Sequence, residues 1–172
     1  METKATNSLQ QLFHNEIYRL IASETLLKNT MPKWIDETQN LPLKNMLQNY
    51  YYQINVHIDR LKSLCDSHKE NRNHCVIDRV MQAYIEETNE KLKRCSSNIL
   101  DSSLLEAIQA ISSYKFHAYN SVATWAIVLE FPKDAKFLNE AKISEKNIDE
   151  RLFHLAIRDI NRKVRNPIAI TI

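Results

Sequence analysis

The chain has 172 residues and a formal net charge of only +2, and it contains no glycine. This length fits one domain with a sizeable apolar core, and the balanced charge gives no sign of nucleic acid or an anionic membrane as a partner. Because phosphate-binding loops, dinucleotide-binding turns and nucleophile elbows depend on glycine, enzymes built on those devices are excluded.

Apolar residues recur at three- and four-residue steps along the chain, which predicts helices joined by short breaks. The first predicted helix runs from about Ser8 to the high thirties and carries Pro32, where we expect a kink or a break. A second helix begins after Pro42, which suits a first helical turn.

Three further helices follow a polar stretch near residue 70. The third, shorter and more polar, covers about residues 76–93. The fourth is expected to begin at Asp101, a residue type that caps helices well, and the fifth begins near Pro132. Four long helices and one shorter helix predict an all-α bundle in a single domain over residues 1–172.

Polar residues, four of them ionisable, interrupt the apolar stripes of these helices. Glu24 lies between Leu20 and Leu27 on the first stripe, and the other ionisable residues are His57 on the second, Lys115 on the fourth and Glu145 on the fifth. Because a buried charge without a partner costs several kcal/mol, the inward charges must meet one another or an ion unless they lie on a partly exposed boundary face.

These residues allow two buried arrangements. Carboxylates from several facing helices together with a histidine hold dinuclear iron or manganese in helical bundles. A divalent cation would repel the Lys115 ammonium, however, and the ammonium can itself lie between Glu24 and Glu145. The second arrangement is therefore a metal-free salt-bridge network of Lys115, Glu24 and Glu145.

Several short motifs, in order, resemble the YciE/YciF-type ferritin-like family of bacterial proteins. They are Leu12-Phe13-His14-Asn15-Glu16-Ile17, Ser23-Glu24-Thr25-Leu26-Leu27-Lys28, Met31-Pro32-Lys33-Trp34, Ile85-Glu86-Glu87-Thr88-Asn89-Glu90, and Glu145-Lys146 with Asp149. The likeness covers residues 8–163. It implies a ferritin-like up-down bundle with a carboxylate-rich centre, in proteins loosely linked to stress and without an established reaction.

The resemblance also assigns positions, residue by residue. It implies metal-ligand positions at Glu24, His57, Glu145 and Asp149. The chain departs from the family pattern at Gln53, Ser112, Lys115 and Ser144, where family members usually carry acids or, on the fourth helix, a Glu-His-Tyr-Glu stretch. About half of the expected acids are thus replaced by neutral or cationic groups.

We therefore expect a bundle with a degenerate metal site, no catalytic residues and no cofactor, acting by association with itself or with another protein. The alternative is a working di-iron or di-manganese protein, an oxidase or iron handler, with Glu24, His57, Glu145 and Asp149 as ligands. A third interpretation, if the inner polar residues are exposed, is an unrelated helical module that binds a partner protein.

The remaining expectations concern partners and location. We expect a homodimer, with a further protein partner possible and neither nucleic acid nor membrane involved. The N-terminus has no apolar signal core and the chain has three cysteines, which favours the cytoplasm. The apolar C-terminal tail, residues 164–172, is expected to dock on the bundle or on a second subunit.

Overall fold

The computed structural model describes residues 8–68 and 76–164, and every regular element in these two ranges is helical. The elements are α1 (Leu9–Glu37), α2 (Leu41–Ser67), α3 (Arg79–Arg94), α4 (Ser97–Val128), α5 (Pro132–Leu155), a π-helical turn η1 (Ala156–Ile160) and the short α6 (Asn161–Val164). The predicted all-α bundle of four long helices and one shorter helix is confirmed.

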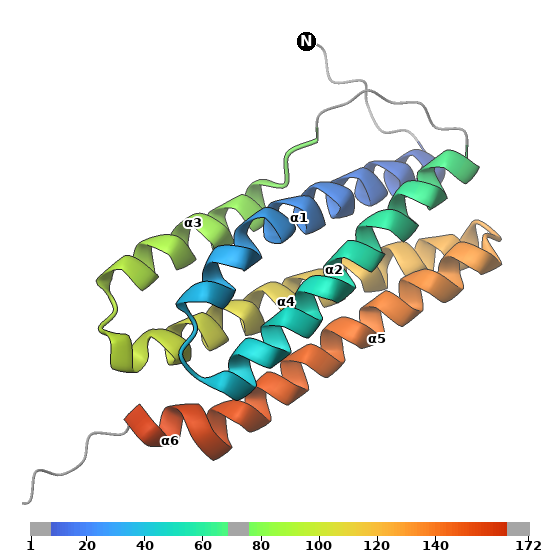
Figure 1. The fold of residues 1–172 in the computed structure, drawn as a ribbon. Coiled ribbons are helices and arrows are strands. Elements are labelled where there is room, and N and C mark those ends of the chain that lie inside the picture. The colour runs from blue at the N-terminus through green and yellow to red at the C-terminus, as the bar shows by residue number, and fades with distance from the viewer. Residues whose placement is uncertain (1–7, 69–75, 165–172) are drawn as a thin grey trace, which may run out of the picture.

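The four long helices form two antiparallel hairpins, α1–α2 and α4–α5 (Figure 1). Between them, α3 carries the chain back along the bundle, so that α2 and α4 run in the same direction (Figure 1). A bundle of two hairpins joined by one long crossover is the ferritin-like arrangement. Because α3 packs against α1 and α4, it covers the bundle on the side away from α2 and α5.

Of the kink or break expected at Pro32, the break into a separate piece carrying Trp34 does not occur. Helix α1 continues without interruption to Glu37. Proline removes one backbone hydrogen bond, but Met31 and Trp34 on either side of it are completely buried. The indole of Trp34 also donates a 3.0 Å hydrogen bond to Asn89 of α3. Packing of these residues therefore keeps the last turns of α1 helical beyond Pro32.

Helix α4 begins four residues before the expected start, and Asp101 is not its N-cap. Ser96 occupies the N-cap position, and Asp101 lies in the second turn of the helix. Its carboxylate instead accepts hydrogen bonds from the backbone amides of Gln39 (3.1 Å) and Asn40 (2.8 Å). Asp101 thus provides hydrogen-bond acceptors for the backbone amides of the α1–α2 loop, which explains the presence of an acid at this position.

The α4–α5 connection needs a left-handed residue, and the chain supplies it without glycine. Glu130 has φ of 60° and is the one non-glycine residue with positive φ among those described. The amide of Phe131 donates to the carbonyl of Ala126 (2.8 Å), and that of Glu130 donates to Ile127 (3.1 Å). This pair of hydrogen bonds is a Schellman motif, which glycine usually completes.

The apolar core consists of two clusters separated along the bundle axis. One cluster centres on Leu27, Trp34, Leu47, Ile108 and Leu152, and the other on Phe13, Leu20, Leu61, Val122 and Leu138. A layer of buried polar residues lies at the middle of the bundle, where the two clusters adjoin. Within the described ranges, no helix combines the length and apolar character that crossing a bilayer requires.

Candidate functional site

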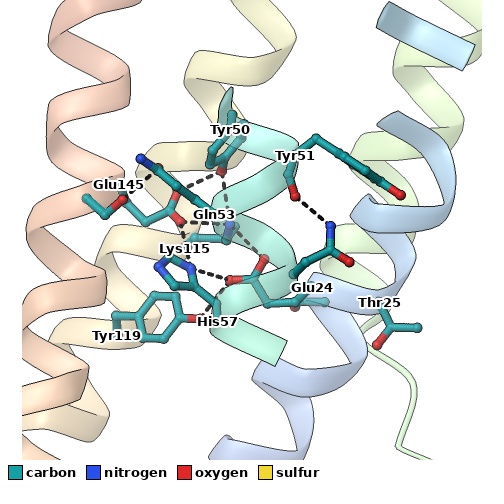
Figure 2. Close-up of polar contacts among 12 residues, drawn as sticks. Glu24, Thr25, Tyr50, Tyr51, Gln53, His57, Lys115, Tyr119 and Glu145 are labelled. Carbon is teal, nitrogen blue, oxygen red and sulfur yellow. Dashed lines mark hydrogen bonds and ion pairs between the residues drawn. The ribbon is translucent and has the colours of Figure 1, made fainter. Parts of the chain in front are cut away.

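The polar layer is built by one or two side chains from each of the four long helices, and all of them project inward (Figure 2). No member of the layer is more than 6% exposed. The six residues are Glu24 from α1, Tyr50 and His57 from α2, Lys115 and Tyr119 from α4, and Glu145 from α5.

The Lys115 ammonium lies between the two carboxylates. Its Nζ is 2.9 Å from Glu24 Oε2 and 2.7 Å from Glu145 Oε1, and neither oxygen makes a separate hydrogen bond within the described part of the chain. Nζ also donates to the Tyr50 hydroxyl at 3.0 Å and lies 4.7 Å from the centre of that ring. Lys115 Nζ thus lies within 3.0 Å of three oxygen atoms, two from carboxylates and one from a phenol.

Two tyrosines and a histidine satisfy the remaining carboxylate oxygens. The Tyr50 hydroxyl donates to Glu145 Oε2 at 2.6 Å, and the Tyr119 hydroxyl donates to Glu24 Oε1 at 2.7 Å. His57 Nδ1 lies 3.2 Å from Glu24 Oε1 and 3.7 Å from Glu145 Oε1. Each carboxylate oxygen therefore has a partner within the layer, as buried polar groups require.

The two carboxylates are not equivalent. Burial alone would raise the pKa of Glu24, but the Lys115 charge and the contacts from His57 and Tyr119 lower it below its usual value. Burial raises the pKa of Glu145 in spite of Lys115, and the neighbouring Glu24 charge adds to the increase. The layer therefore favours ionised Glu24, and it accommodates a proton on Glu145 more readily.

The cation and the phenols also respond to this environment. Burial alone would lower the pKa of Lys115, but the two carboxylates raise it above its usual value. Burial and the adjacent carboxylates raise the pKa values of Tyr50 and Tyr119 well above those of a free tyrosine. Both phenols are therefore hydrogen-bond donors to the carboxylates and not anions.

The structure brings Glu24, His57, Lys115 and Glu145 together but does not bring Asp149 to them. Asp149 lies one turn beyond Glu145 on α5, is half-buried, and accepts a 3.1 Å hydrogen bond from Gln109. It is absent from the one cluster of potential metal ligands in the described ranges, which consists of Glu24, His57 and Glu145.

The other residues that depart from the family pattern find partners of their own. The Ser144 hydroxyl donates to Gln53 Oε1 at 2.8 Å, which joins α5 to α2 beside the layer. Ser112 is completely buried, and its hydroxyl donates to the carbonyl of Gln109. These neutral groups bond to each other or to backbone and add no negative charge to the centre.

The residues present do not fit a dinuclear metal centre. Ligand atoms of Glu24, His57 and Glu145 lie within 4.8 Å of one another, so the cluster has the right dimensions to surround a cation. The cation among them is the Lys115 ammonium, at hydrogen-bond distance from both carboxylates. Two divalent ions need bridging carboxylates to offset their charge, and this layer offers only two, both engaged by Lys115.

A second polar network, which the sequence analysis missed, lies on the α3 side of α1 and α4. Asp78, the N-cap of α3, is 1% exposed and accepts hydrogen bonds from Ser23 and from the Tyr114 hydroxyl (2.6 Å). Arg19 donates to the same hydroxyl at 2.6 Å and is paired with Glu16. The position of Asp78 just before an apolar helical pattern was a signal that could have identified this residue as a helix N-cap.

The family model for a domain of unknown function, DUF892, matches residues 8–165 of the chain. A match over this share of the sequence, on an all-α bundle with a polar centre, defines the class: the chain belongs to the DUF892 family. It is similar to the protein YciF of Escherichia coli K12, with 28% identity over 163 residues covering 92% of this chain and 96% of that protein. The resemblance to a YciF-type family is therefore confirmed.

Two solved structures share the fold. The E. coli stress protein YciF superposes with a TM-score of 0.84 and 24% identity, covering 91% of this chain and 99% of that one. YcfI of Rhodopseudomonas palustris superposes with a TM-score of 0.82 and 19% identity, covering 89% and 98%. These likenesses establish the bundle topology.

Proposed function

We propose that this chain is a non-enzymatic member of its family, in which a lysine ammonium replaces the metal ions of a bundle centre. The observation that carries the proposal is the placement of Lys115 Nζ 2.9 and 2.7 Å from the carboxylates of Glu24 and Glu145. With the lysine in the place of metal ions, the role that we propose for the protein is that of a rigid structural or binding scaffold.

Association with a second copy or with another protein is the role that the surface supports. Seven large apolar side chains on α2, α4, α5 and η1 are more than half exposed: Leu41, Tyr52, Ile127, Val128, Ile143, Phe153 and Ile157. Scattered apolar residues are common on surfaces, but this number suits a protein with an interface. The relative YcfI is described as a candidate structural protein and YciF as a stress protein. A structural role under stress, as a homodimer, is our proposal for this chain.

The cytoplasm is the proposed compartment. Cys65 and Cys95 are both free thiols, as is usual where the environment is reducing. The expected tail, residues 164–172, lies outside the described residues except for Val164, which ends α6.

The decisive experiment measures metal bound to protein produced with added iron and, separately, added manganese. The wild-type chain should purify with far less than one ion per chain. A Lys115→Glu variant, which removes the cation and adds a third carboxylate, should take up metal. Lys146→Glu is the matched control, because Lys146 is an exposed lysine on α5 that contacts only Glu150 among the described ion pairs.

About two ions per wild-type chain would overturn the proposal and establish the alternative, a dinuclear metal protein. That alternative has one observation in its favour, the mutual proximity of potential ligand atoms on Glu24, His57 and Glu145. Light scattering of the purified protein tests the association: a mass of two chains supports the homodimer, and a single-chain mass at high concentration excludes it.

A further inference from the structure

Lys115 and Glu145 are held in the direct contact that a covalent reaction between their side chains requires. Both side chains are 0% exposed, and Lys115 Nζ lies 2.7 Å from Glu145 Oε1, one of the two oxygens bonded to the carboxyl carbon Cδ. In water, solvation keeps an ammonium and a carboxylate ionised and apart. In a dry interior both charges are costly, while a neutral amide costs much less to bury.

We propose that the side chains of Lys115 and Glu145 condense to an isopeptide bond that joins α4 covalently to α5. The proposal rests on the metal-free centre proposed above, because ions held by the carboxylates would keep the two side chains apart. The ion pair in Figure 2 is the state that precedes the reaction.

The reaction balances with no oxidant, reductant or other reactant. The Lys115 ammonium and the Glu145 carboxylate form an amide and one water molecule, with no net change in charge. The bond formed joins Nζ to Cδ of Glu145, and the bond broken joins Cδ to Oε1. Of the three protons on Nζ, one stays on the amide nitrogen and two leave with Oε1 as water.

Two further residues hold the positions that this condensation needs. Glu24 Oε2 lies 2.9 Å from Nζ, so it can accept a proton from the ammonium and return it to the departing oxygen. The Tyr50 hydroxyl donates to Glu145 Oε2 at 2.6 Å, which draws electron density from the carboxyl carbon and stabilises negative charge on that oxygen during attack. Oε2 then becomes the amide carbonyl oxygen and keeps Tyr50 as its donor.

The departing water has a short route to the surface. An opening of about 170 Å³ between α4 and α5 is lined by the buried Glu145 and Ser112, by the half-buried Asp149 and by the exposed His117 and Lys146. Holding the reacting groups in contact also raises their effective concentration far above that of free amine and acid. The product would leave Glu24 paired with His57 and would permanently exclude metal from the centre.

The mass of the purified wild-type protein tests the proposal directly. The intact chain should be lighter than its sequence requires by one water molecule, and the loss should persist after denaturation. Trypsin should fail to cleave after Lys115, so fragmentation should identify residues 95–133 linked to residues 143–146. An intact mass equal to that of the sequence in metal-free, folded protein would overturn the isopeptide bond and leave the metal-free centre standing.

Variants separate the reaction from other losses of water. Lys115→Met should restore the full mass because the amine is gone. Glu24→Gln retains both reacting groups and nearly the same shape, and it should lower the linked fraction at least tenfold if Glu24 carries the proton. Lys146→Met, which removes the neighbouring exposed lysine, should leave the bond intact; a full-mass Lys146→Met protein, or a fully linked Lys115→Met protein, would contradict the assignment. Metal-loaded wild-type protein at full mass would overturn both this bond and the proposed function.

Discussion

Neighbouring residues on the same two helices face two different polar networks. On α1, Ser23 contacts Asp78 and Glu24 contacts Lys115; on α4, Tyr114 contacts Asp78 and Lys115 contacts Glu24. One network lies at the centre of the bundle, and the other holds the start of α3 against α1 and α4. The first is closed to solvent, whereas the second is open through the partly exposed Arg19.

The difference shows how each network meets the cost of burying charge. In the centre, the charges compensate one another. Removing any one of them leaves a buried charge that neither a partner nor water stabilises. At α3, hydrogen bonds from hydroxyl and backbone groups stabilise a single carboxylate, that of Asp78. Solvent can compensate part of a loss there. The central network should therefore be much less tolerant of substitution.

The largest expected effect comes from Lys115→Met. This change removes Lys115 from the ion pair and from the proposed isopeptide bond and leaves Glu24 and Glu145 facing each other. We expect the free energy of unfolding to fall by about 3–5 kcal/mol. Urea denaturation followed by circular dichroism measures it. A triple variant that adds Glu24→Gln and Glu145→Gln should recover much of the loss. A single variant within about 1 kcal/mol of wild type would show that the central charges are not coupled in this way.

Asp78→Ala should have a smaller and more local effect. It removes the N-cap of α3 and the acceptor for Ser23 and Tyr114, and we expect a loss of about 2 kcal/mol. Amide hydrogen exchange should show faster opening of residues 79–94 while the centres of α4 and α5 stay protected. Equal acceleration throughout the bundle would mean that α3 is not a separate unit of stability.

Acid should act on the α3 network through Asp78. Although burial alone would raise it, the hydrogen bonds from Ser23 and Tyr114 hold the pKa of Asp78 below its usual 3.8. Because the folded pKa is the lower one, the carboxylate stabilises the fold above pH 3.8, and this contribution is lost as the pH falls through the folded pKa. The difference in unfolding free energy between wild type and Asp78→Asn should therefore shrink below pH 3.8. A constant difference from pH 6 to pH 2 would contradict the shift.

Periodicity was sufficient for the bundle and for the central network, but not for the α3 network. Glu24, Lys115 and Glu145 interrupt strong apolar stripes, so their inward direction follows from helical spacing. Ser23 and Tyr114 lie at stripe edges where either orientation is compatible with the sequence. Asp78 meets them only because the crossover returns α3 alongside α1, and no local pattern reports that placement. Asp101 was misassigned for a similar reason, since its partners lie in the distant α1–α2 loop.

The smallest expected effect lies outside both networks, at the α4–α5 turn, and it has the opposite sign. Glu130 has φ of 60°, a conformation that costs a residue with a Cβ about 1 kcal/mol relative to glycine. Glu130→Gly should raise the free energy of unfolding by about 1 kcal/mol, and Glu130→Ala should give no such gain. Since the turn is remote from the central layer, the changes in unfolding free energy caused by Glu130→Gly and Lys115→Met should be additive in the double variant. Thermal denaturation of the single and double variants measures this, and no gain from glycine would mean that the Glu130 side chain itself stabilises the turn.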